Sequence, residues 1–278
     1  MDIKYNVIKI NDNKKEEIKD HISVEEPLEM ILQYKKNGNW QTENLSITMR
    51  TPGNDKDLIS GFLFNERIIE NFSQLVKVET KGDKVGDYNI QNKIEATIDN
   101  PKNIDIDKLK RNFLTNSSCG VCGKSSLDVV EVIKNEKLNL SFPRIKKEII
   151  MKSPELLMNE QSEFSKTGGI HASSLINDSG KIIVTREDVG RHNALDKVIG
   201  YAHKNKLIDN RSQFIACSGR LNFELIQKGL MSNIGVMAGV GAPTSLAIDL
   251  AKRFGMTLLG FVKNNSFNIY TNKERIIL

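Results

Sequence analysis

A regular exchange of strand-like and helix-like segments runs through the second half of this chain, and it constrains the fold more than any other feature. Short apolar runs between turn residues predict strands, and segments with apolar residues on one face predict helices. The predicted strands are residues 170–176, 181–185, 213–217, 235–238 and 256–262, and the predicted helices are residues 193–206, 222–232 and 244–254. Such alternation predicts a largely parallel sheet with helices on both faces, and ligands bind such sheets outside the carboxyl ends of the strands.

The first half of the chain has a different pattern, which predicts a smaller α+β region. Residues 1–25 alternate weakly, as an edge strand or a loose lead-in does. Asn37 and Gly38 both tolerate positive φ and signal a hairpin turn. We also expect a helix capped by Asn54 or Asp55, strands joined by a Gly82–Asp83 turn, and further helices at the end of this region. These strands are residues 75–81 and 88–98, and these helices are residues 105–116 and 126–135.

A polar crossing at residues 137–147 marks a domain boundary. We therefore divide the chain into an N-terminal α+β domain (residues 1–136) and a C-terminal αβα domain (residues 137–278). Ser153, Pro154 and Glu155 predict a helix start, because serine caps, proline suits the first helical position and an acid suits the first turn.

Charge and composition exclude several classes of protein. The chain has 278 residues and a formal net charge of +5, which suits an anionic ligand but lacks the dense basic stripe of a nucleic-acid-binding protein. No run is long and apolar enough to cross a bilayer, and the polar N-terminus does not resemble a signal peptide. We expect a cytoplasmic protein whose three cysteines stay as thiols.

Two of these cysteines, Cys119 and Cys122, lie in a glycine-rich loop that is followed by Lys124. A nearby cation and the amides of a tight turn lower the pKa of a thiol, and the thiolate is the reactive form. Reactive sulfur chemistry is therefore one reading of the pair. The other two are half of a zinc site, although no second pair with this spacing exists, and a structural role.

Four polar clusters follow the predicted strands, at residues 186–193, 218–220, 239–244 and 263–266. Glycine-rich turns and helix N-termini present free N–H groups to anions, and arginine and lysine add charge-assisted contacts. The cations of these clusters are Arg186, Arg191, Arg220 and Lys263. Together the clusters predict a site for a phosphorylated ligand such as a nucleotide.

Three further side chains are candidates for reactive groups. His171 lies in an apolar stretch, which favours a hydrogen-bonded core histidine over an acid–base role. His192 lies at a helix start, where capping, ligand contact and catalysis are all open. Cys217 lies among apolar residues and is expected to be buried and inert.

Several strings of residues resemble the FdhD family of formate dehydrogenase accessory sulfurtransferases. The most specific is EDVGRHNALDK at residues 187–197, and the resemblance extends through nearly the whole chain in order. The other strings are RTPGN at 50–54, GFLF at 61–64, CGVCG at 119–123, TGGIHA at 167–172 and GFVK at 260–263.

The resemblance implies a C-terminal domain with a cytidine deaminase-like three-layer fold. It implies a sulfur carrier that accepts persulfide sulfur from a cysteine desulfurase and delivers it to Mo-bis(molybdopterin guanine dinucleotide) for formate dehydrogenase. It favours a homodimer, and GDP or a related guanine nucleotide is expected to bind at the same place as the cofactor. No nucleic acid, membrane or resident metal is expected.

By motif position, the resemblance assigns the persulfide to Cys119 and a partner role to Cys122. It places the cofactor-binding segment at Phe261, Val262, Lys263, Asn264, Asn265 and Ser266. The strand-end clusters add Arg191, His192, Arg220 and Gly239 as cofactor-binding residues.

The chain departs from the family pattern at two places. Asn264, Asn265 and Ser266 stand where family members often carry glycines and an arginine, and asparagine tolerates the positive φ of glycine. Arg67 stands where glycine is frequent. Two alternative functions are a cofactor-binding chaperone without sulfur transfer and a zinc-dependent deaminase-like enzyme. The second lacks the usual order of deaminase motifs.

Overall fold

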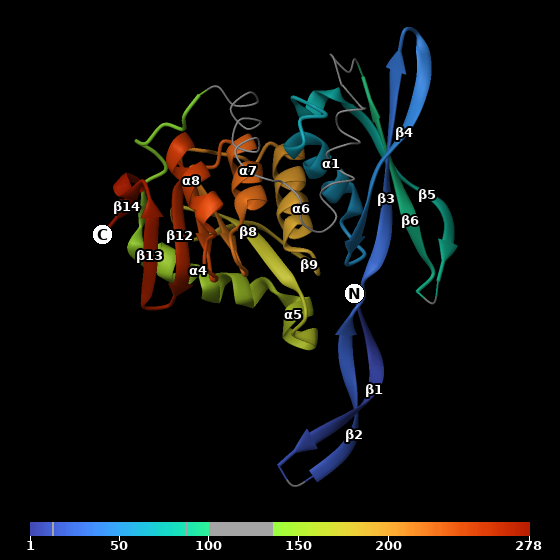
Figure 1. The fold of residues 1–278 in the computed structure, drawn as a ribbon, viewed down its shortest axis with the longest axis horizontal. Helices are drawn as coiled ribbons and strands as arrows, with labels where there is room; N and C mark the ends of the chain where they lie inside the picture. The colour runs from blue at the N-terminus through green and yellow to red at the C-terminus, as the bar shows by residue number, and fades with distance from the viewer. Residues whose placement is uncertain (13, 87, 100–135) are drawn as a thin grey trace.

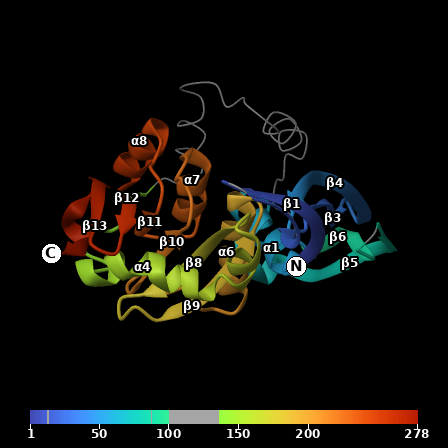
Figure 2. The ribbon, with the colours of Figure 1, turned by 90° about the horizontal axis from the view of Figure 1, so that it is seen from below.

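The computed structural model describes residues 1–12, 14–86, 88–99 and 136–278. Its largest element is a six-stranded sheet with the order β13-β12-β11-β10-β8-β9 (Figures 1 and 2). These strands are β8 (His171–Asn177), β9 (Ile182–Asp188), β10 (Gln213–Cys217), β11 (Val236–Gly239), β12 (Thr257–Lys263) and β13 (Ser266–Thr271).

The sheet is mixed, so the expectation of a largely parallel sheet was wrong. Within this sheet the parallel pairings are β10–β11 and β11–β12, and helical crossovers join these strands. The pairings β8–β9, β8–β10 and β12–β13 are antiparallel. Tight turns join β8 to β9 and β12 to β13, and a hairpin turn can join only antiparallel neighbours.

Helices cover both faces of this sheet, which makes three layers. On one face, side chains such as Ile215, Met237 and Leu258 pack with α6 (Arg191–Lys204), α7 (Phe223–Met231) and α8 (Ser245–Phe254). On the other face, the alternate residues, such as Phe214 and Leu259, pack with α4 (Lys147–Glu160). Successive side chains of a strand point to opposite faces of the sheet, so each strand contributes residues to the apolar cores on both faces.

The first half forms a four-stranded sheet with the order β4-β3-β6-β5, in which β3 lies between β4 and β6. Its strands are β3 (Glu26–Lys36), β4 (Asn39–Arg50), β5 (Leu75–Val85) and β6 (Ile90–Ile98). One face packs on α1 (Asp55–Asn65), whose buried residues include Leu58, Ile59 and Leu63. The predicted Asn37–Gly38 hairpin is confirmed, with φ of 52° and 82° at these residues.

Helices α1 and α6 join the two halves through an unusually close crossing. A Cβ on Gly61 would lie 1.9 Å from the Asp196 carbonyl oxygen, and a Cβ on Gly200 would lie 2.0 Å from that of Asp57. Only hydrogen atoms fit at these two positions. The buried residues of both halves accordingly form one continuous cluster.

Residues 1–25 are a hairpin arm rather than an edge strand. Among the described strands, β1 (Asp2–Asn11) and β2 (Lys14–Ser23) pair only with each other, and Figure 1 shows the arm extending away from the rest of the described chain. The remaining short elements are η1 (Phe72–Gln74), β7 (Ile145–Lys146), α5 (Ser162–Thr167), η2 (Lys273–Arg275) and β14 (Ile276–Ile277).

Two predicted element boundaries were wrong. α4 begins at Lys147, and Pro154 lies inside it. Proline cannot donate to the carbonyl of Ile150, but the Ser153 hydroxyl donates to that oxygen at 2.7 Å, so the helix continues. Gly82 and Asp83 form an irregularity between β5 and β6, whose turn instead contains Gly86 and Asn89 with positive φ.

The predicted helices at 105–116 and 126–135 lie outside the described residues, as does the predicted cysteine loop. Within the described part of the chain, no helix has the length and hydropathy needed to cross a membrane.

Candidate functional site

The four predicted clusters come together at one edge of the six-stranded sheet. The carboxyl ends of β10, β11 and β12 are neighbours, as the pairs Cys217↔Gly239 and Ala238↔Leu259 show. β9 ends at the same edge, because Asp188 pairs with His171 at the start of β8, and β8 pairs with β10. We refer to this region as the strand-end edge.

Backbone hydrogen bonds tie the loops of the strand-end edge to one another. The amide of Gly241 donates to Gly219 at 3.2 Å, and the amide of Phe261 donates to Gly241 at 3.2 Å. A Cβ on Gly241 would lie 2.8 Å from the Arg220 nitrogen, so only glycine allows this approach. The loops after β10 and β11 and the end of β12 therefore form one continuous surface.

Three helices begin at this edge. α6 follows β9, α7 follows β10 and α8 follows β11. Asn222 caps α7 by accepting from the Leu225 amide, and Thr244 caps α8 by accepting from the Ala247 amide. The three N-termini direct partial positive charge to the same place.

Three cationic side chains at the edge have no charged partner among the described residues: Arg191, Arg220 and Lys263. The Nε atom of Arg191 is buried and makes no hydrogen bond within the described chain. Cations without counter-ions beside helix N-termini form a site for an anion, and phosphate suits their donors.

Arg186 does not belong to this set, contrary to the sequence prediction. Its guanidinium donates to Asp57 at 2.9 Å and lies 4.3 Å from the Tyr201 ring centroid. Side chains along β9 point alternately to the two faces of the sheet, and that of Arg186 points toward α1 and α6. Arg186 therefore contributes to the contact between the two halves.

His192 contacts the N-cap residue of α7 and a glutamate in the first turn of that helix. Its Nε2 lies 2.7 Å from a Glu224 carboxylate oxygen and 3.2 Å from the Asn222 side-chain oxygen. The hydrogen bond from His192 lowers the pKa of Glu224. The same contact fixes the orientation of the His192 ring. Sequence reasoning missed Glu224, whose signal was an acid in the first turn after a capping asparagine.

His171 is not the hydrogen-bonded core residue that the sequence predicted. It is half-buried at the strand-end edge, and a Cβ on Gly219 would lie 3.2 Å from its Nδ1. Burial lowers the pKa of His171, and the positive charges of Arg191 and His192 lower it further. Both effects favour the neutral form of the His171 ring.

The segment from Phe261 to Ser266 splits into exposed and buried parts. Phe261 is 45% exposed and adopts a left-handed φ of 51°, whereas Val262 is buried in the core. Lys263 pairs with Ser266 across the turn between β12 and β13. The positive φ in this segment falls on Phe261 and not on Asn264 or Asn265.

Two of the remaining predicted residues lie inside the molecule. Gly239 is buried, and a Cβ there would lie 2.9 Å from the Leu221 side chain. The absence of a side chain at Gly239 therefore lets Leu221 pack beneath the loops. Cys217 is buried, which raises the pKa of its thiol to about 11, in agreement with the inert thiol that was predicted. Cys119 and Cys122 lie outside the described residues.

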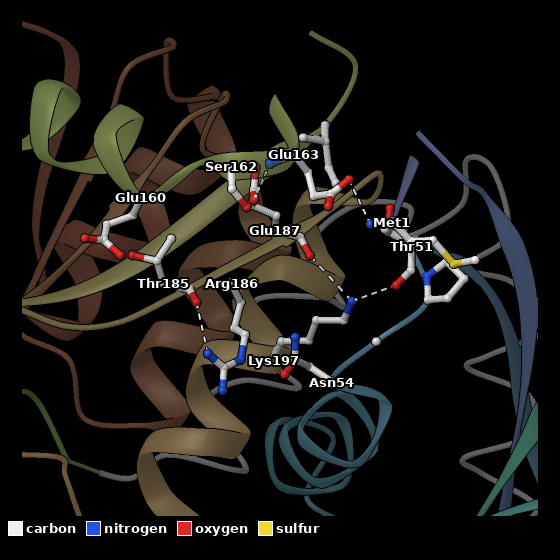
Figure 3. Close-up of a pocket in the computed structure, with 13 residues that line it drawn as sticks. Met1, Thr51, Asn54, Glu160, Ser162, Glu163, Thr185, Arg186, Glu187 and Lys197 are labelled. Carbon is white, nitrogen blue, oxygen red and sulfur yellow. Dashed lines mark hydrogen bonds and ion pairs between the residues drawn. The ribbon is translucent and has the colours of Figure 1, made fainter. Parts of the chain in front are cut away.

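A separate polar cavity of about 300 Å³ lies where the two halves meet (Figure 3). The Lys197 ammonium at its wall donates to the Thr51 carbonyl at 2.9 Å and pairs with Asp188 at 2.7 Å. The Glu187 carboxylate accepts from the amides of Glu163 and Phe164. Lys197, Asp188 and Glu187 therefore already have partners within the described chain, and the cavity lies at the contact between the two halves.

The comparison with protein families decides the relationship. The model of the FdhD/NarQ family matches residues 24–277. The chain belongs to the FdhD/NarQ family.

Individual relatives agree with this FdhD/NarQ assignment. The chain is 38% identical to the sulfur carrier protein FdhD of Sulfurisphaera tokodaii, over 98% of this chain and 97% of that one. It is 39% identical to the protein of the same name from Streptomyces coelicolor, over 98% and 94%. In structure it is similar to a putative formate dehydrogenase accessory protein from Desulfotalea psychrophila, with a TM-score of 0.74, 22% identity and 99% of each chain covered. That likeness concerns the fold.

Proposed function

We propose that this protein is a cytoplasmic sulfur carrier that accepts persulfide sulfur from a cysteine desulfurase. It passes this sulfur to Mo-bis(molybdopterin guanine dinucleotide), which formate dehydrogenase then receives. The observation that carries the proposal is the convergence at one edge of three helix N-termini and three cations that have no charged partner among the described residues. The relatives of this chain are named sulfur carriers. The proposal also includes the cytidine deaminase-like type for the three-layer fold.

The cargo has the chemistry that the strand-end edge fits. A guanine dinucleotide presents phosphate groups, for which Arg191, Arg220 and Lys263 are suitable donors. It also presents flat ring systems, and the exposed ring of Phe261 is a surface on which such a ring can stack. In this proposal His192 stays oriented by Glu224 beside the bound phosphates.

The sulfur step is a thiol–disulfide type of exchange. The Cys119 thiolate attacks the outer sulfur of the donor's persulfide, the S–S bond of the donor breaks, and the donor leaves as a thiolate. Cys119 then carries the sulfur as its own persulfide, and no net oxidation or reduction occurs. Lys124 is close in sequence and is proposed to favour the thiolate.

Intact-protein mass spectrometry tests the carrier role. After incubation with a cysteine desulfurase and cysteine, we expect the wild type and the Cys122→Ala variant to gain one sulfur atom. Cys119→Ala is expected to gain none and to leave formate dehydrogenase inactive. A Cys119→Ala protein that still gains sulfur and still activates the dehydrogenase contradicts the assignment.

Isothermal calorimetry with GDP tests the binding edge independently. We expect Arg220→Ala and Lys263→Ala to weaken GDP binding about tenfold each, which corresponds to the loss of one charge-assisted contact. Lys252→Ala is the matched control, because Lys252 is an exposed cation in the last turn of α8, away from the edge. No GDP binding by the wild type at millimolar concentration counts against this edge as the cofactor site.

A cofactor-binding chaperone is the second candidate, because the cations and helix N-termini of the edge come from segments other than the one that carries Cys119 and Cys122. It predicts that a Cys119→Ala/Cys122→Ala double variant retains GDP binding and full activity in cells. The sulfur-carrier proposal predicts retained GDP binding with lost activity, so one variant separates the two functions.

A further inference from the structure

A carboxylate lies among the cations of the strand-end edge. Of the three helices that begin there, α7 carries an acid, Glu224, in its first turn, whereas α6 and α8 carry none. A carboxylate repels phosphate, so Glu224 weakens a site that binds phosphate alone. Its position indicates that the ligand of this edge also brings a group that a carboxylate attracts.

One oxygen of the Glu224 carboxylate is still available to a ligand. Oε2 lies 2.7 Å from the His192 Nε2 and accepts from the Asn222 side chain at 3.5 Å. Oε1 makes no hydrogen bond or ion pair with the rest of the described chain. The side chain is 41% exposed, so a ligand at the edge can reach Oε1.

The surroundings of Glu224 keep this carboxylate ionised. The hydrogen bond from His192 lowers the pKa of Glu224, partial burial opposes this shift, and the charges of His192 and Lys228 add to it. Lys228 lies one turn further along α7 and pairs with Asp196 at 2.9 Å. An ionised carboxylate accepts hydrogen bonds and donates none, so the group that Glu224 recognises must be a donor.

The orientation of His192 does not by itself explain Glu224. The side-chain oxygen of Asn222 contacts the same His192 nitrogen at 3.2 Å. An uncharged side chain therefore already positions the ring, and a carboxylate adds a negative charge that a phosphate site does not need. This charge and the available Oε1 atom together favour direct contact between Glu224 and the ligand.

Guanine has the donors that this carboxylate fits. Its N1–H and its N2 amino group lie side by side on one edge of the ring, and two parallel N–H donors match a carboxylate. Adenine has an acceptor at N1 and no amino group at C2. A carboxylate offers about four acceptor positions, so Oε2 can accept from the base while it holds His192. On the basis of the proposed function, whose cargo carries guanine, we propose that Glu224 recognises the guanine base and determines the base preference of the strand-end edge.

Calorimetry with four nucleotides tests the proposal: GDP, inosine diphosphate (IDP), xanthosine diphosphate (XDP) and ADP. IDP lacks the N2 amino group, so the wild type is expected to bind it about tenfold more weakly than GDP. XDP carries an oxygen in place of that amino group and brings it against the carboxylate. We expect XDP and ADP to bind more weakly still.

The Glu224→Gln variant is expected to change the order of these nucleotides. Its side-chain amide donates to the XDP oxygen and no longer attracts guanine, so GDP binding weakens about tenfold and XDP binding strengthens about tenfold. The gain in XDP binding is decisive, because neither a damaged fold nor a displaced His192 produces it. Asp249→Asn is the control, since it makes the same change to an exposed acid on α8 and is expected to leave the base preference unchanged.

The outcomes separate this inference from the proposed function. A wild type that binds no GDP at millimolar concentration contradicts both the binding edge and the role of Glu224. If the wild type prefers GDP and the Glu224→Gln variant binds GDP, IDP and XDP more weakly in the same proportion, Glu224 acts only through His192. That result overturns the inference and leaves the binding edge intact, as does a wild type that binds GDP and ADP equally well.

Discussion

At the scale of single residues, His203 shows how burial changes a titrating group. Its ring lies 4.5 Å from that of Phe64 and stacks on that of Phe72 at 5.2 Å. Burial lowers the pKa of His203 from 6.5 to about 4, because the apolar surroundings disfavour the imidazolium. The folded protein therefore binds this proton less readily than the unfolded chain.

His203 is expected to destabilise the protein as the pH falls. Above pH 6.5 the His203 ring is neutral in both the folded and the unfolded chain, and the free energy of unfolding keeps its full value. Between pH 6.5 and about 4 only the unfolded chain takes up the proton, so the free energy of unfolding falls by about 1.4 kcal/mol per pH unit. The His203→Phe variant keeps the stacking and removes the proton. Urea unfolding between pH 7.5 and 4.5 is therefore expected to show a weaker pH dependence for the variant than for the wild type. Equal slopes contradict the prediction.

Arg67 adopts a backbone conformation that is unfavourable for a residue with a side chain. It adopts a left-handed φ of 59°, a backbone conformation that favours glycine. Its guanidinium is half-buried, and burial lowers its pKa. Its Nε lies 3.1 Å from the Met231 sulfur, which is a weak acceptor.

Replacing Arg67 by glycine is expected to stabilise the protein by about 0.5–1 kcal/mol. Relief of the strained φ outweighs the greater entropy of glycine in the unfolded chain. Arg67→Ala removes the side chain but keeps the strain, and it separates the two effects in denaturant titrations. A glycine variant that is no more stable than the alanine variant contradicts the explanation.

At the scale of elements, the crossing of α1 and α6 decides how the two halves fit. The backbone of each helix occupies the space of a side chain on the other, at Gly61 and Gly200. No flexible side chain can move aside to make room, because the atoms in contact are main-chain carbonyls.

Gly200→Ala is expected to destabilise the protein by about 3 kcal/mol, since the added methyl forces the helices apart. Thermal unfolding measures the loss. Gly169→Ala is the control, because its Cβ would meet nothing closer than 3.8 Å. Similar melting temperatures for the Gly200→Ala variant and the wild type indicate a looser crossing than the structure shows.

At the scale of the whole molecule, a buried ion pair joins the two halves. Lys197 and Asp188 are 1% and 0% exposed, and Lys197 also donates to the carbonyl of Thr51 in the first half. The Thr51 amide donates to Asp188 in return. Burial raises the pKa of Asp188, and the Lys197 charge opposes this shift.

Removing one partner of this pair is expected to cost more than removing both. Lys197→Met leaves a buried carboxylate without its cation, which destabilises by about 3–5 kcal/mol. The Lys197→Met/Asp188→Asn double variant is expected to lose less than the sum of the two single variants. A double-mutant cycle from urea unfolding measures this coupling, and strict additivity contradicts it.

The sequence predicted the strand-end edge because strand and helix periods are local. Arg191 and Arg220 come three residues after the ends of β9 and β10, Lys263 is the last residue of β12, and topology brings such positions together. It did not separate Arg186 from this group, since its partner Asp57 is 129 residues away. Glu224 was missed for the same reason, because its contact with His192 crosses from α7 to α6.

By itself, then, the sequence determined the elements, the cluster of cations and the family, because periodicity, turn residues and motifs are properties of neighbouring residues. Tertiary structure alone decided the antiparallel pairing of β8 with β10, the glycine contact between α1 and α6, and the exposed arm. These features depend on which surfaces meet, and packing between residues far apart in the chain selects them. The pattern of neighbouring residues therefore does not predict them.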